Sequence, residues 1–168
     1  MTTTTTSAPA CVAPAVGVRA PSFTLVDQHG TPTSLDDQLG ARHVVLVFVP
    51  FAFSGICTGE LREIRDRLED FEGDDVTVLV ISCDSLYSMR VWADIEGYFF
   101  SLLSDFWPHG EVARAYGVFS EANGFALRGT FLIDRDGILR WSSVSETGLA
   151  RDFDEFRAAL ADLRSPVH

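Results

Sequence analysis

The sequence predicts an α/β domain in which helices cover both faces of a mixed β-sheet. Two continuous runs of β-branched and aromatic residues, 44–49 and 76–81, have the composition of strands buried on both faces. Apolar residues at helical spacing lie between these runs, and a hairpin followed by a last helix closes the chain. Strands that alternate with helices in this way form a sheet with helices on both sides.

A hairpin and an amphipathic helix are expected in the first half of the chain. Residues 23–26 and 33–35 are predicted to pair as strands across the glycine-containing turn at 27–30. Between the two buried runs, apolar residues recur at spacings of three and four, as in a helix that ends at Gly73. This apolar stripe consists of Leu61, Ile64, Leu68 and Phe71.

A second helix and a fifth strand are expected in the middle of the chain. The helix follows Ser85 and stops near Gly97, and residues 99–103 have the composition of a strand. A short helix over residues 111–116 comes next. The buried face of the second helix is predicted to carry Leu86, Met89, Trp92 and Ile95.

The last elements are a hairpin and a closing helix. The Asp-Gly turn within residues 134–137 is predicted to join strands 129–133 and 138–142. Asp152 is the expected cap of the final helix. The apolar stripe of that helix consists of Phe153, Phe156, Leu160 and Leu163.

Composition limits the classes of function. A net charge of −11 over 168 residues argues against nucleic acid and anionic membrane surfaces as partners. The first ten residues lack a signal-peptide pattern, and the longest apolar run, 44–53, contains a proline and is too short to span a bilayer. We therefore expect one cytoplasmic domain over residues 16–168, preceded by a flexible tail over residues 1–15.

The cysteines and histidines suggest neither disulfides nor metal. Cys11, Cys57 and Cys83 are odd in number and have no paired spacing, which favours a reducing compartment. The four histidines are isolated from one another, and no glycine-rich phosphate loop is present. No metal and no cofactor are expected.

Cys57 is the residue most suited to chemistry. It follows a buried strand and stands at the start of the first amphipathic helix, where N–H groups and the helix dipole favour a thiolate. It precedes Leu61 by four residues, so its sulfur is expected to face a pocket against the core. Ser54 lies in the turn that bounds this pocket, with helix capping as its alternative role. For Pro50 the alternative is that it only ends the strand.

The segment around Cys57 resembles the active-site motif of peroxiredoxins. Residues 50–57, PFAFSGIC, match a proline, three residues, a threonine or serine, two residues and the peroxidatic cysteine. Three further segments are similar to the family in order and spacing: 20–25, 103–106 and 127–131. Three others resemble its one-cysteine alkyl hydroperoxide reductase E branch: 55–57, 102–110 and 116–119. The resemblance covers residues 16–163 and implies a thioredoxin-like fold and a thiol-dependent peroxidase.

The resemblance implies roles for four residues. Cys57 would attack a peroxide oxygen and become a sulfenic acid. Arg128 would stabilise the thiolate and bind the peroxide oxygens. Ser54, in place of the usual threonine, would hydrogen-bond the substrate, and Pro50 would shield the sulfur from solvent. The substrates implied are hydrogen peroxide, organic hydroperoxides and peroxynitrite.

The resemblance also implies a second arginine and a homodimer. Arg151 is similar to a family arginine that orients the carboxylate of the site, expected here to be Glu60. Dimers of the family form near the active site, and exposed aromatic residues would suit such a surface. The candidates are Phe51, Phe53, Phe106 and Trp107.

The reductant and the alternatives stay open at this point. No cysteine occupies the resolving position of the other branches, so we expect an external thiol: a low-molecular-weight thiol, a glutaredoxin-like or a thioredoxin-like protein. Cys83, at a strand end, and Cys11, in the tail, are the alternatives for a two-cysteine mechanism. A disulfide oxidoreductase would need Cys-x-x-Cys, whereas residues 57–60 read CTGE. The remaining alternative to a peroxidase is a redox sensor or a chaperone-like protein with the same fold.

Overall fold

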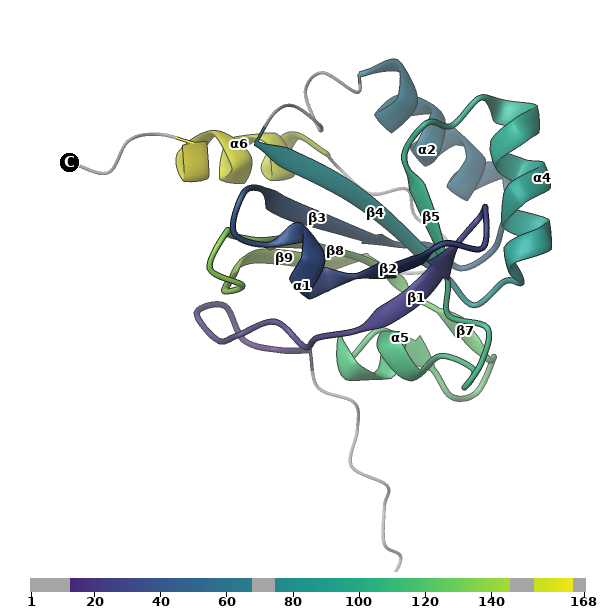
Figure 1. Cartoon of the computed structure of the whole chain (residues 1–168), viewed down its shortest axis with the longest axis horizontal. Coiled ribbons are helices and arrows are strands. Elements are labelled where there is room, and N and C mark those ends of the chain that lie inside the picture. Colours follow the sequence, from purple (N-terminus) through teal and green to yellow (C-terminus); the bar gives the residue numbers. More distant parts are fainter. Residues whose placement is uncertain (1–12, 68–74, 146–152, 165–168) are drawn as a thin grey trace, which may run out of the picture.

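A seven-stranded mixed sheet forms the centre of the protein (Figure 1). The computed structural model describes residues 13–67, 75–145 and 153–164. The sheet has the order β2-β1-β5-β4-β3-β8-β9; β3, β4 and β5 run parallel, and the other neighbouring pairs are antiparallel. Its strands are β1 (Thr24–Asp27), β2 (Pro32–Ser34), β3 (His43–Phe48), β4 (Val76–Ser82), β5 (Ser101–Ser104), β8 (Arg128–Ile133) and β9 (Leu139–Ser145).

Helices cover both faces of this sheet, as the sequence predicts. Val45 and Val47 of β3 belong to a core that includes residues of three helices: α2 (Gly55–Asp66), α4 (Leu86–Glu96) and α6 (Phe153–Arg164). Val44 and Leu46 belong to a second core, which includes residues of two short helices: α1 (Leu35–Gln38) and α5 (Glu111–Ala115). Successive side chains of a strand point to opposite faces, so the sheet separates the two cores.

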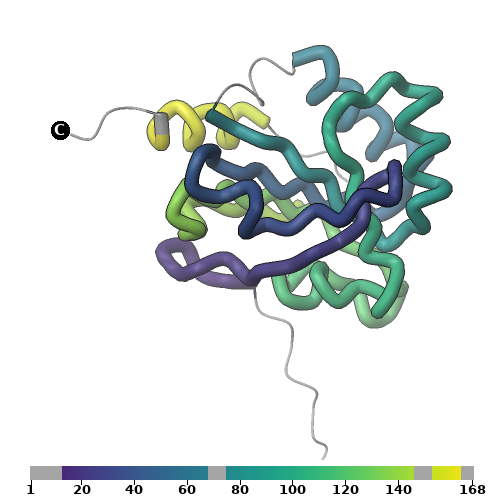
Figure 2. Tube along the Cα trace, viewed as in Figure 1, coloured from purple at the N-terminus to yellow at the C-terminus, as the bar shows by residue number. Residues whose placement is uncertain are grey.

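α2 and α4 lie side by side on their face of the sheet (Figure 2). Arg62 of α2 forms an ion pair with Glu96 of α4, with Nε and Oε2 at 2.6 Å. Arg65 donates to the main-chain carbonyl of Glu96. These contacts join the two helices into one layer on this face of the sheet.

Two details predicted for this region are wrong: one buried position of the helix and the start of the next strand. Ile95 is 68% exposed, because at about 100° per residue it lies about 120° around the helix from the buried Met89. Ala93 takes the buried place instead. β5 begins at Ser101 rather than at residue 99, and Phe99 is 85% exposed, because Gly97 ends α4 in a left-handed conformation with φ of 69°.

Two small elements have no counterpart in the prediction. α1 begins directly after β2, where the Ser34 hydroxyl accepts a hydrogen bond from the Asp37 N–H at 3.1 Å. A two-stranded hairpin, β6 (Phe119–Ser120) with β7 (Phe125–Ala126), lies before β8. Strands this short carry too little alternation to be read from sequence.

The described part of α2 ends at Asp66, short of the predicted Gly73. Leu68, Phe71, Gly73 and the proposed cap Asp152 lie outside the described residues, as do Cys11 and Arg151. Among the residues that are described, no helix combines the length and apolarity needed to cross a bilayer. The same residues contain no cluster of potential metal ligands.

Candidate active site

Cys57 is the third residue of α2 and is fully buried. Its side chain joins the core between α2, α4 and the sheet, together with Leu61 and Ile64, as the apolar stripe predicts. The first backbone hydrogen bond of the helix runs from the Thr58 N–H to the Ser54 carbonyl at 2.8 Å. The N–H of Cys57 therefore belongs to the first turn of the helix, where the dipole favours a negative charge.

Arg128 brings a positive charge to this thiol from a distant part of the sequence. It is the first residue of β8, which pairs with β3 so that Thr130 lies opposite Val47. Its Nη2 lies 3.4 Å from Cys57 Sγ in hydrogen-bond geometry, and the side chain is 2% exposed. The contact places a buried guanidinium directly beside the sulfur of Cys57.

Glu60 lies one turn after Cys57 and forms a buried ion pair with the same guanidinium. Nη1 of Arg128 donates to Glu60 Oε1 while Nη2 donates to the sulfur. The planar fork of Arg128 thus spans the carboxylate and the thiol. The family resemblance pairs Glu60 with Arg151, which lies outside the described residues. In the structure, Arg128 is the arginine that contacts Glu60.

Ser54 and Pro50 bound the site where β3 passes into α2. Ser54 occupies the N-cap position, but its side chain makes no capping hydrogen bond to the helix. Its hydroxyl therefore does not cap the helix, which is the usual role of a serine at this position. Pro50 is buried directly after β3.

Two aromatic residues of the α4 region hold the first turn of α2. Trp92 Nε1 donates to Thr58 Oγ1 at 3.2 Å, and the Tyr98 hydroxyl donates to the Thr58 carbonyl at the same distance. The rings of Trp92 and Tyr98 also pack edge to face, with centroids 5.3 Å apart. From the sequence, Trp92 is expected only as a core residue, and its hydrogen bond to Thr58 is not predicted. The one feature of the sequence that could have indicated this bond is the hydroxyl group of Thr58, directly after Cys57.

Comparisons with known proteins decide which family this site belongs to. A profile of the AhpC/TSA family matches residues 16–142. The chain belongs to the AhpC/TSA family. It is a peroxiredoxin with a thioredoxin-like fold, a thiol-dependent peroxidase, as the resemblance in its sequence predicts.

Several peroxiredoxins are similar to it over most of their length. Alkyl hydroperoxide reductase E of Mycobacterium tuberculosis is 49% identical over 148 residues, which cover 88% of this chain and 97% of the relative. The chloroplastic 2-Cys peroxiredoxin BAS1 of Hordeum vulgare is 32% identical over 161 residues, 90% of this chain and 76% of the relative. The crystal structure of peroxidoxin BcpB from Mycobacterium tuberculosis matches with a TM-score of 0.79 and 31% identity, covering 89% of this chain and 98% of that one.

Cys83 of this peroxiredoxin lies on the opposite face of the sheet from Cys57. It follows β4, and its side chain belongs to the core covered by α1 and α5. Neither cysteine is in a disulfide. Burial, and after it the nearby carboxylates of Asp105 and Asp84, raise the pKa of the Cys83 thiol to about 12, against a smaller lowering by the backbone hydrogen bond with Ala126.

The four aromatic residues that the sequence analysis names as surface candidates are exposed, as expected. Phe51 is 48% exposed, Phe53 51%, Phe106 53% and Trp107 81%. The Phe51 ring packs against Phe125 of β7, with centroids 4.8 Å apart. These four residues are called the aromatic surface below.

Proposed function

We propose that Cys57 is the peroxidatic nucleophile and Arg128 its electrostatic partner. The observation that carries this proposal is the 3.4 Å contact between Arg128 Nη2 and Cys57 Sγ, two buried side chains that meet at the start of a helix. A cation, first-turn N–H groups and the helix dipole all favour the thiolate, which is the reactive form of cysteine.

In the proposed reaction the Cys57 thiolate attacks the terminal oxygen of a hydroperoxide in line with the O–O bond. The S–O bond forms as the O–O bond breaks, so the sulfur is oxidised to a sulfenic acid and the peroxide is reduced. The leaving alkoxide or hydroxide takes up a proton and departs as an alcohol or water. Arg128 stabilises the negative charge that develops on this oxygen.

The other residues of the site would place the peroxide. The uncommitted hydroxyl of Ser54 is the proposed hydrogen-bond partner of the substrate. Pro50 would close the pocket toward solvent and slow further oxidation of the sulfur. Glu60 would hold the Arg128 fork in place through its ion pair, and Arg151 is proposed as its second partner.

Regeneration is proposed to use one cysteine and an external thiol. That thiol attacks the sulfenic sulfur and releases water, and a second thiol then reduces the mixed disulfide. The placement of Cys83 across the sheet supports this scheme, because a disulfide needs Cα atoms about 4.4–6.8 Å apart. The proposed donors are a low-molecular-weight thiol, a glutaredoxin-like or a thioredoxin-like protein.

The one-cysteine scheme has a direct test. Cys83→Ser and Cys11→Ser are each expected to keep full turnover with an external thiol. If either variant loses turnover while its Cys57 is still oxidised at the parent rate, that cysteine is the resolving residue. A trapped mixed disulfide with one specific protein, without turnover on small thiols, would favour a redox sensor.

Hydrogen peroxide, organic hydroperoxides and peroxynitrite are the proposed substrates, and the cytoplasm is the proposed location. We also propose a homodimer formed through the aromatic surface, because exposed aromatic rings next to a site commonly mark an interface. Sedimentation at micromolar concentration tests this: a dimer that Trp107→Ser weakens is expected, and a monomeric parent would contradict it.

Stopped-flow fluorescence of the reduced protein mixed with peroxide tests the proposed chemistry. Trp92 reports on the site, since its indole N–H contacts the residue next to Cys57. A fast change complete at one equivalent of peroxide, with a gain of one oxygen in intact mass, is expected. The change should disappear in Cys57→Ser. A rate no faster than that of an unactivated thiol would favour the chaperone-like reading.

A further inference from the structure

The loop between β3 and α2 carries a strained residue next to the site. Phe53 has a φ of 66°, a left-handed conformation that is uncommon for a bulky side chain and persists only where its surroundings hold it. The Phe51 ring packs against Phe125 and the Phe53 ring lies near Trp92, although both phenylalanines stay about half exposed. A backbone contact holds the loop as well.

A carboxylate outside the loop makes that contact. The Ala52 N–H, directly before the strained residue, donates to Asp84 Oδ2 at 2.8 Å. Asp84 lies after β4, in the connection to α4, and is separated from Ala52 by 32 positions in the sequence. The family motif around Cys57 contains no residue that performs this function.

Hydrogen bonds from two strands fix Asp84, one to its carboxylate and one to its main-chain carbonyl. The Ser82 hydroxyl donates to the same oxygen at 2.7 Å, and the Asp84 N–H donates back to Ser82 Oγ at 3.2 Å. The Ser104 hydroxyl, at the end of β5, donates to the Asp84 carbonyl at 2.6 Å. Ser82 is fully buried, so this network ties the loop to the rigid centre of the sheet.

We propose that Asp84 is a positioning residue for peroxide reduction, acting through the Ala52 N–H on the loop that places Ser54 and the start of α2. This inference rests on the proposed roles of Cys57 and Ser54. A displacement of about 1 Å in a reacting group costs about a hundredfold in rate.

Two alternatives predict different outcomes. If Asp84 acted only through its negative charge near the thiolate, Asp84→Ala and Asp84→Asn would shift the pH–rate profile alike. If it served only global stability, neither variant would change the relative reactivity of Cys57 toward different reagents. If Asp84 positions the loop, Asp84→Ala, which removes the hydrogen-bond acceptor, should slow the oxidation of Cys57. Asp84→Asn, which removes only the charge, should change this rate little.

The experiment uses the full chain with Cys11→Ser and Cys83→Ser as the parent, so that only Cys57 reacts. Two second-order rate constants are measured for each variant: oxidation by hydrogen peroxide and alkylation by iodoacetamide. Alkylation needs a thiolate and access to it, whereas oxidation also needs the placed pocket.

Asp84→Ala is expected to lower the oxidation rate about ten- to a hundredfold, with alkylation unchanged or faster. Asp84→Asn keeps an oxygen for the Ala52 N–H and is expected to stay within about threefold of the parent in oxidation, because only the charge of the acceptor is lost. The midpoint of the pH–rate profile should be the same in the parent and in both variants.

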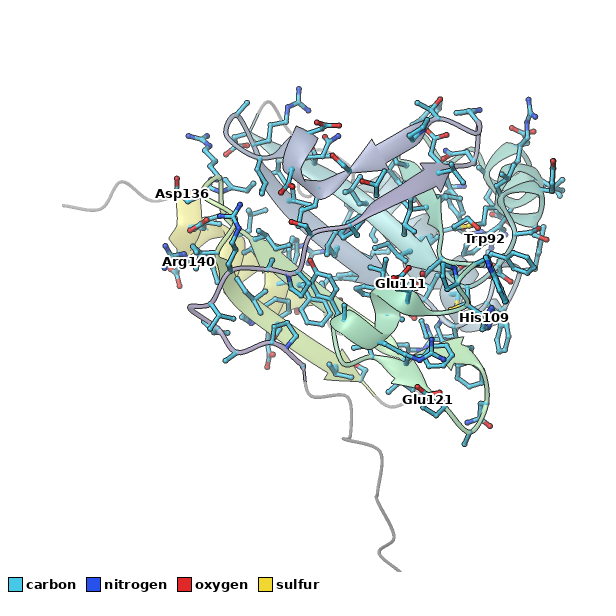
Figure 3. All side chains as sticks on the ribbon, turned by 60° about the horizontal axis from the view of Figure 1, so that its bottom comes forward. Trp92, His109, Glu111, Glu121, Asp136 and Arg140 are labelled. Atoms are coloured by element: carbon cyan, nitrogen blue, oxygen red, sulfur yellow. The ribbon has the colours of Figure 1, made fainter. Side chains whose placement is uncertain are left out.

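Asp134→Ala is the matched control. Asp134 also accepts main-chain N–H groups, from Asp136 at 2.9 Å and Ile138 at 3.0 Å, but in the β8–β9 turn. Figure 3 shows Asp136 and Arg140 at the opposite end of the molecule from Trp92 and His109. This variant loses comparable hydrogen bonds and is expected to keep the parent oxidation rate.

Each other result has one meaning. If the parent is oxidised rapidly and Asp84→Ala keeps that rate, the inference about Asp84 is overturned and the proposed function stands. If Asp84→Asn loses as much as Asp84→Ala, the charge rather than the placement is responsible, and the inference is again overturned. If the parent itself is not oxidised rapidly, the proposed function fails.

Thermal unfolding identifies variants that do not fold. Should Asp84→Ala prove unfolded, Ser82→Ala decides, because it removes one of the donors that fix the carboxylate. A fall in oxidation of about threefold or more, without a fall in alkylation, then supports the inference. An unchanged oxidation rate in Ser82→Ala overturns it.

Discussion

Cys57 and Cys83 are both buried, yet different charged groups lie beside them. Cys57 lies in the first turn of α2 with a guanidinium nitrogen 3.4 Å from its sulfur. Cys83 lies beside the carboxylates of Asp105 and Asp84, and burial raises its pKa to about 12. Burial by itself disfavours a thiolate, so a nearby cation or anion determines whether a buried cysteine becomes a nucleophile.

Alternation along the strands keeps the two environments apart. Val76, Val78 and Val80 of β4 face the core of Cys57, whereas Leu79 and Ile81 face the core of Cys83. The sheet therefore separates the thiol that a guanidinium contacts from the thiol whose pKa nearby carboxylates raise. Substitutions on either face can remove or measure the difference in reactivity between Cys57 and Cys83.

The largest effect is expected from Cys57→Ser. The serine hydroxyl is not ionised at neutral pH, so peroxide reduction should fall by more than about ten-thousandfold. Cys83→Ser is the matched variant on the other face and should keep the parent rate. Peroxide consumption with an external thiol measures both, and substantial loss in Cys83→Ser would remove the distinction between the two thiols.

The next effect concerns the reactivity of Cys83 itself. Because its pKa is raised to about 12, its thiolate at about pH 8 should be about a thousandfold scarcer than that of an ordinary cysteine. In Cys11→Ser/Cys57→Ser protein, iodoacetamide labelling should therefore be slow and should rise about tenfold per pH unit. The unfolded protein is the control, and a labelling rate that levels off near about pH 8.5 would contradict this environment.

Loss of the buried cation is expected to have the third-largest effect. Arg128→Ala should lower the rate of Cys57 oxidation about a hundredfold to a thousandfold, since it removes the charge facing both thiolate and leaving oxygen. It should also destabilise the fold by about 3–5 kcal/mol, because Glu60 loses this buried partner. Arg128→Lys keeps the charge without the fork and should recover part of the rate.

Arg140→Ala is the control for this arginine. Arg140 pairs with Asp134 at 2.5 Å, but on β9 at the other end of the sheet. Stopped-flow oxidation and thermal unfolding are measured for all three variants. A parent-like rate in folded Arg128→Ala would show that the helix start alone activates Cys57.

The smallest effect is expected at Ser54. Ser54→Ala removes one hydrogen bond to the peroxide and should lower the oxidation rate about tenfold. Ser54→Thr restores the hydroxyl and should equal or exceed the parent, because the added methyl group restricts its rotation. Equal rates in all three proteins would mean that the hydroxyl does not touch the substrate, and unchanged unfolding temperatures would exclude a capping role.

Local patterns account for much of this molecule. The two buried runs became β3 and β4, and the stripe containing Leu61 placed Cys57 at a helix start facing the core, because burial and period act over a few residues. The motif around Cys57 and the segment around Arg128 also identified the family. Where the periodic signal weakened, at Ile95 and Phe99, the prediction was wrong.

The resemblance to peroxiredoxins names Arg128 as the partner of Cys57, but only tertiary structure brings the charged groups to the two thiols. Arg128 and Cys57 are 71 positions apart, and only the antiparallel register of β8 on β3 brings the guanidinium to the helix start. The same holds for Asp84 and Ala52, and for the carboxylates beside Cys83. The sequence by itself thus determined the long strands and helices and singled out Cys57, whereas α1, β6 and β7 were not predicted. The electrostatic difference between its two buried thiols arises from contacts between distant segments, which no local pattern encodes.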